Sequence, residues 1–88
     1  MDALPVTAPN KLSRGEFVEL TYCGQTIAAM VMLASTNGRS LVLGFDGALH
    51  VEGGGMFAGS MPLLQDDDGI YRDLVVGSPA IIEPRQKQ

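Results

Sequence analysis

The chain has 88 residues and a mass of 9.3 kDa, which fits one domain and excludes two. Hydrophobic residues make up 45% and charged residues 18%, a mixture too apolar for an intrinsically disordered chain. The net charge is −4 and reaches −7 between residues 15 and 83, where two basic residues oppose nine acidic ones, so nucleic acid is disfavoured as a partner.

The first residues of the chain carry Pro5 and Pro9 and show no hydrophobic periodicity. This pattern predicts an extended N-terminal arm over residues 1–14. No basic region followed by an apolar block precedes the domain, and a single cysteine, Cys23, excludes an intrachain disulfide. We therefore expect a cytoplasmic protein with one domain over residues 15–84 and a tail over 85–88.

The strand pattern begins after Gly15. Residues 17–22 alternate with a period of two, which predicts a strand with Val18, Leu20 and Tyr22 on its buried side. Cys23 and Gly24 can make the turn that follows. The alternation indicates that the domain starts with a half-buried strand.

The next segment, residues 27–34, is apolar at every position. A strand there has residues 27, 29, 31 and 33 on one side and 28, 30, 32 and 34 on the other, although periodicity alone leaves a buried helix open. Eight residues are far fewer than the roughly 20 of a membrane helix, so no membrane is expected. The outer side, with Ala28, Met30 and Met32, is the candidate self-association face.

Turn residues divide the rest of the chain. Asn37 with Gly38, and Asp46 with Gly47, predict turns that bound a strand over 41–45 and another over 48–52. From Gly53 to Pro62 we expect an irregular loop.

The C-terminal part is expected to hold a turn over 66–69, a strand over 70–76 and a last strand over 80–83. Short strands separated by Gly-rich turns predict an all-β fold, a small five- or six-stranded SH3-like barrel.

Two segments carry a family resemblance. Residues 18–24, followed by an apolar strand and residues 41–43, resemble the first half of an Sm-like domain, and residues 74–82 are similar to its second motif. The resemblance implies an Sm-like barrel that assembles edge to edge into a ring. It also implies RNA binding, although Val76 stands where the family carries a basic residue.

Few side chains suit catalysis or metal binding. Cys23 and His50 are the only cysteine and histidine, too few for a structural zinc site, and they lie in no catalytic signature. Asp66, Asp67 and Asp68 are hard oxygen ligands but do not fit the EF-hand spacing. We therefore predict no enzyme activity, no catalytic residue, no metal site and no cofactor.

Methionine and phenylalanine mark a second candidate site. Met56, Phe57 and Met61 lie in the predicted Gly-rich loop, and methionine is common on adaptable binding surfaces. We expect a non-enzymatic interaction module that forms a homo-oligomer and binds a protein or peptide of unknown identity. The alternatives are a domain that binds a small ligand or divalent cation under a Gly-rich lid, and an Sm-like RNA-binding ring protein.

Overall fold

A computed structural model describes residues 12–85 of the chain. They form a closed antiparallel barrel in which each strand pairs with the next and the last pairs with the first. The six strands are β1 (Phe17–Tyr22), β2 (Gln25–Ala34), β3 (Ser40–His50), β4 (Met56–Gln65), β5 (Tyr71–Asp73) and β6 (Pro79–Pro84). The all-β prediction is confirmed, with the larger of the two expected strand counts.

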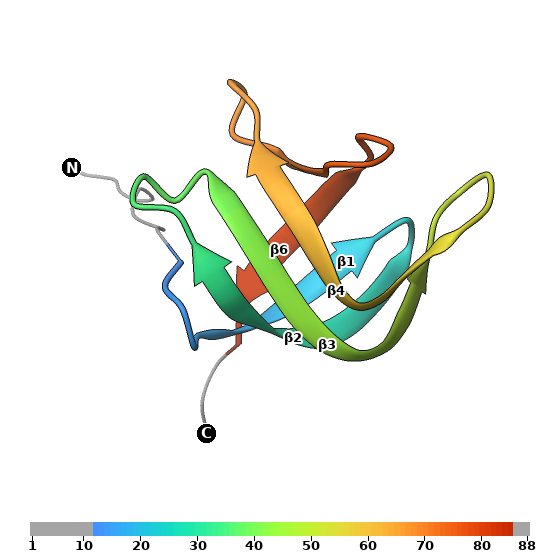
Figure 1. The fold of residues 1–88 in the computed structure, drawn as a ribbon, viewed down its shortest axis with the longest axis horizontal. Helices are drawn as coiled ribbons and strands as arrows, with labels where there is room; N and C mark the ends of the chain where they lie inside the picture. The colour runs from blue at the N-terminus through green and yellow to red at the C-terminus, as the bar shows by residue number, and fades with distance from the viewer. Residues whose placement is uncertain (1–11, 86–88) are drawn as a thin grey trace.

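The barrel closes where the first and last strands meet. β1 pairs with β6 from Val18 opposite Pro84 to Tyr22 opposite Ala80. Figure 1 shows β3 and β4 crossing the molecule together, with the loop that joins them projecting beyond the barrel. No helix in residues 12–85 is long and apolar enough to cross a membrane.

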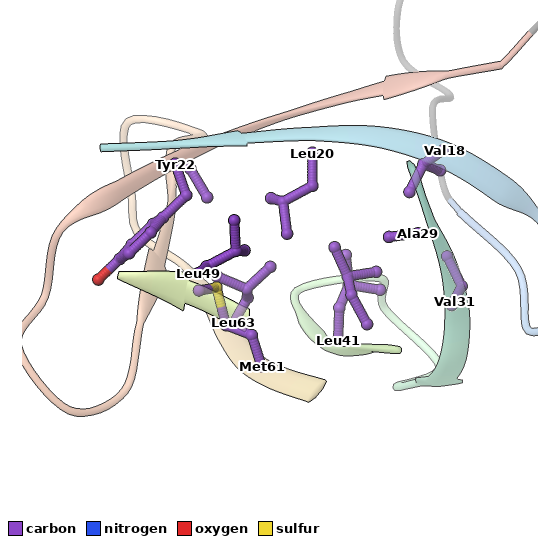
Figure 2. Close-up of a cluster of buried hydrophobic side chains, with 11 residues drawn as sticks. Val18, Leu20, Tyr22, Ala29, Val31, Leu41, Leu49, Met61 and Leu63 are labelled. Carbon is purple, nitrogen blue, oxygen red and sulfur yellow. The ribbon is translucent and has the colours of Figure 1, made fainter. Parts of the chain in front are cut away.

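The barrel interior is filled by side chains from five of the strands. Figure 2 shows them pointing into one cluster, with Val18 and Val31 at one end and Tyr22 at the other. The buried apolar residues are Val18, Leu20, Tyr22, Ala29, Val31, Leu41, Leu43, Leu49, Met61, Leu63 and Ala80. The predicted inward positions of β1 are thus confirmed.

A bulge in β2 changes which side chains face outward. Val31 pairs with Leu43 and Leu33 pairs with Val42, so Met32 has no partner of its own. An extra residue shifts the alternation by one position. Leu33 is consequently exposed whereas Val31 is buried, and the prediction that both lie on the same side of the strand was wrong.

β3 is one strand and not two. The predicted turn at Asp46 and Gly47 lies inside β3, at an irregularity where the pairing with β4 shifts between Gly44 and Ala48. Gly47 has a φ of 99° and Gly59 on β4 has a φ of 80°, so glycine allows both strands to bend here without ending. Asp46 and Gly47 do change the direction of the chain, but they form a bend within a longer strand and not a turn between two strands.

The predicted loop from Gly53 to Pro62 was also wrong. Gly53, Gly54 and Gly55 form the tight connection, and β4 starts at Met56. Within this connection the Val51 amide donates to the Gly55 carbonyl at 3.0 Å. The glycine-rich sequence is here a hairpin turn between two long strands.

The predicted strand over 70–76 is shorter in the structure. β5 spans only Tyr71–Asp73, and residues 74–76 form an exposed bend before β6. The predicted arm over 1–14 lies mostly outside the described residues, although Leu12 packs against the core. Of the predicted tail over 85–88, only Arg85 is described, and its amide donates to the Phe17 carbonyl at 3.1 Å.

A glutamine side chain joins β2 to the far end of β3. β2 and β3 pair directly only from Met30 onward. At the start of β2, the Gln25 amide group donates to the His50 carbonyl and accepts from the His50 amide, both at 2.8 Å. One side chain therefore replaces the missing strand pairing and holds the hairpin of β3 and β4 against the barrel.

Candidate interaction surface

Exposed apolar side chains gather on the outer face of β1 and β2. Phe17, Ala28, Met30 and Met32, which we call the apolar strip, line one open groove of about 450 Å³. Phe17 is opposite Met30 in the strand register, and Phe17 and Met32 are 59% and 45% exposed. The structure thus places the predicted self-association residues together and adds Phe17, which the sequence reading had assigned no role.

Gly44 on β3 forms the floor beneath Met32. A Cβ atom added at Gly44 would overlap the Met32 Sδ and lie 2.9 Å from its Cγ. The missing side chain therefore lets Met32 lie flat across β3, and the groove continues to Gly59 on β4. Glycine here serves packing against a neighbour, since Gly44 is not among the residues with a positive φ.

The fold does not bring the three residues of the second candidate site to one surface. Met56, Phe57 and Met61 all lie on β4. Met61 is fully buried in the core, and Phe57 is half-buried with its ring edge-on to Tyr22 at a centroid distance of 5.9 Å. Only Met56 is well exposed. These three residues are separated because side chains alternate along a strand. The sequence analysis expected a loop here and therefore did not apply this alternation.

Cys23 and His50 come together at one end of the barrel. Both line a pocket of about 510 Å³ with Gln25, Val51 and Glu52. Cys23 is an exposed free thiol in the turn between β1 and β2. Among the hydrogen bonds of the described residues none joins its sulfur to the imidazole.

The acidic turn between β4 and β5 is hydrogen-bonded to itself. One Asp66 oxygen accepts from the amides of Asp68 and Ile70, and the other accepts from Arg72 Nε at 3.0 Å. The hydrogen bond from Arg72 and the Ile70 amide lower the pKa of the Asp66 carboxyl. Within residues 12–85 no group of three or more His, Cys, Asp or Glu side chains is arranged to hold a metal ion. Divalent-cation binding stays the alternative that the sequence analysis left open.

One buried carboxylate was missed by the sequence reading. Asp73 is only 3% exposed. It accepts a hydrogen bond from the Tyr22 hydroxyl at 2.7 Å and four more, between 2.6 and 3.2 Å, from the backbone amides of residues 75–78. Burial acts to raise the pKa of Asp73, but the amides of Val76 and Val75 and the Tyr22 hydroxyl outweigh it and hold the pKa at about 2.

These amides fix the shape of the bend between β5 and β6. Leu74, Val75 and Val76, which we call the apolar loop, are all more than half exposed, Val75 to 74%. An apolar segment held in one conformation loses little entropy when it binds. The apolar loop is therefore a second surface suited to contact with another molecule, at the opposite end of β5 from the acidic turn.

Fold and surface together define a small antiparallel β-barrel with apolar side chains exposed on its outer wall. Comparisons of the chain with protein-family models, with curated proteins and with solved structures found no match in any of the three.

Proposed function

We propose that this protein is a non-enzymatic β-barrel module that self-associates through the apolar strip and binds a protein or peptide partner. The apolar strip is the observation that carries the proposal. The core is already filled from within the barrel, so Phe17, Met30 and Met32 are not needed to fill it. Exposed apolar residues gathered in one groove are typical of an interaction site.

The energetic argument rests on the area that remains exposed. Fully burying a Phe or Met side chain contributes about 1.5 to 3 kcal/mol, and Phe17 alone keeps 59% of its surface in water. A second molecule that covers the strip would recover part of this contribution from each residue. Because association itself costs several kcal/mol, we expect an assembly that forms reversibly with concentration.

The apolar loop supports the second half of the proposal. Leu74, Val75 and Val76 lie outside the groove and are exposed. Asp73 accepts hydrogen bonds from the Val75 and Val76 amides, which holds the loop in one conformation and supports its use as an apolar binding surface. A module that uses the strip for its own copies keeps this loop for a different protein or peptide.

Light scattering during size-exclusion chromatography, over a range of loading concentrations, tests the self-association. We expect the wild-type mass to rise above 9.3 kDa with concentration. Phe17→Ser should remain monomeric, whereas Ile81→Ser should behave as the wild type. Ile81 is the matched control because it is 58% exposed and lies on the outer side of β6, away from the groove. A wild type that stays monomeric at every concentration would refute self-association.

A further inference from the structure

The apolar strip has opposite charges at its two ends. Arg85 lies beside β1, where its amide bonds to Phe17, and Asp46 lies on β3, two residues beyond Gly44. Both residues line the same groove as the strip. Strand pairing orders the face as Arg85, Phe17, Met30 and Gly44, and three strand spacings make it about 14 Å wide.

Within residues 12–85, neither charge forms an ion pair. The ion pairs among the described residues join Arg39 to Asp67 and Arg72 to Asp66. Asp46 and Arg85 are exposed and take part in neither pair. The groove therefore presents one cation and one anion with a band of apolar side chains between them.

We infer that a second copy of this chain covers the apolar strip about a two-fold axis near Met30, with Asp46 of each copy facing Arg85 of the other. The inference rests on the proposed self-association and names its geometry. A two-fold axis places the same patch on both copies. A band that is positive at one end and negative at the other is self-complementary only when one copy is turned end for end.

The two-fold arrangement satisfies both the apolar and the charged residues. Met30 and Met32 meet their counterparts at the centre, where methionine adapts to an uneven surface. The two ion pairs lie at the rim, where they set the orientation of the copies more than the affinity. The same two copies stacked in parallel would bring Arg85 against Arg85 and Asp46 against Asp46.

Charge reversal tests this geometry. D46R leaves two arginines at the strip of each copy, and R85D leaves two acids. At low ionic strength each variant alone should therefore dimerise at least about tenfold more weakly than the wild type. An equimolar mixture of the two variants should recover a dimer that holds one copy of each. The double variant D46R/R85D should dimerise with itself as the wild type does, which also shows that the reversed positions are compatible with folding.

The matched control is D68R, which reverses an exposed charge in the acidic turn and should leave the dimer unchanged. If the wild type dimerises but the mixture and the double variant do not, the two-fold pairing is wrong and the self-association stands. A wild-type assembly larger than a dimer, with a mass that keeps rising with concentration, also overturns the pairing. A wild type that is monomeric at all concentrations overturns both proposals.

Discussion

The Tyr22 hydroxyl donates a 2.7 Å hydrogen bond to the Asp73 carboxylate, which joins the end of β1 to the end of β5. Both residues are almost completely buried. The carboxylate is therefore an anion inside the barrel, with five hydrogen-bond donors around it instead of a cation. Burial without such donors is very costly, so the stability of the barrel depends on this arrangement.

Removing the carboxylate should destabilise the barrel more than removing the hydroxyl. Asp73→Ala leaves four backbone amides and the Tyr22 hydroxyl without their acceptor, and we expect a loss of about 4 kcal/mol in the free energy of unfolding. Tyr22→Phe removes one donor and should cost about 2 kcal/mol. Urea titrations followed by circular dichroism measure both values. Equal losses in the two variants would contradict the role of the amides.

The same carboxylate makes the stability depend on pH. The folded pKa of Asp73 is about 2, below the value of about 3.9 in an unfolded chain. Its contribution is therefore complete above the unfolded pKa and is lost as the pH falls through the folded pKa, a change of about 2.6 kcal/mol.

Urea titrations at a series of acidic pH values measure this loss. Asp73→Asn should show a smaller decrease on acidification than the wild type. The Asp66 carboxyl, whose pKa is also lowered, keeps its own contribution in both proteins and so cancels in the comparison. Identical slopes against pH would rule out Asp73 as the source.

The turn between β1 and β2 contains strain that a substitution can relieve. Cys23 has a φ of 49°, in the left-handed region that costs an ordinary residue roughly 1 kcal/mol. Asparagine tolerates this conformation, so Cys23→Asn should raise the free energy of unfolding by about 0.5 kcal/mol. Cys23→Val, which is β-branched, should lower it. The midpoints of urea denaturation give both changes, and a loss of stability in the asparagine variant would count against the strain.

Gly44 should matter for association more than for folding. Gly44→Ala forces Met32 to move, but Met32 is on the outer wall and flexible, so we expect a cost under about 1 kcal/mol in unfolding. Self-association should weaken severalfold because the strip changes shape. In a Met32→Ala background the same substitution should change stability very little, since nothing remains to overlap. Light scattering and urea titration of the four proteins complete this cycle.

The strands at the N-terminal end could be predicted because one local pattern determined them. Val18, Leu20 and Tyr22 alternate and are buried, and Ala28, Met30 and Met32 follow as outward residues of an entirely apolar segment. The exposure of Leu33 could not be predicted in this way because a bulge depends on the partner strand. Nothing in residues 27–34 alone shows that β3 has one residue fewer.

The strands at the centre of the chain were harder to predict because glycine occurs both where a strand ends and where a strand bends. At Gly53, Gly54 and Gly55 it ends a strand, but at Gly47 and Gly59 it bends one, and both uses need the same backbone freedom. Asp73 was missed because its donors are backbone amides, which carry no sequence signal. Asp46 lies on β3 and Arg85 directly follows β6. These positions are far apart in sequence, so only the folded register brings the two charges to one face.

The pairing of β1 with β6 also decides what happens when the chain is cut. Residues 74–76 form the exposed bend that precedes β6, so the covalent link between β6 and the other strands runs through this bend. A cleavage there would leave β6 attached only by noncovalent contacts. Its loss would uncover the edge of β1 and the buried side chains of Val18 and Leu20, and an open apolar edge recruits other strands. A single cleavage in this bend would thus open the closed barrel and favour aggregation through the exposed edge of β1.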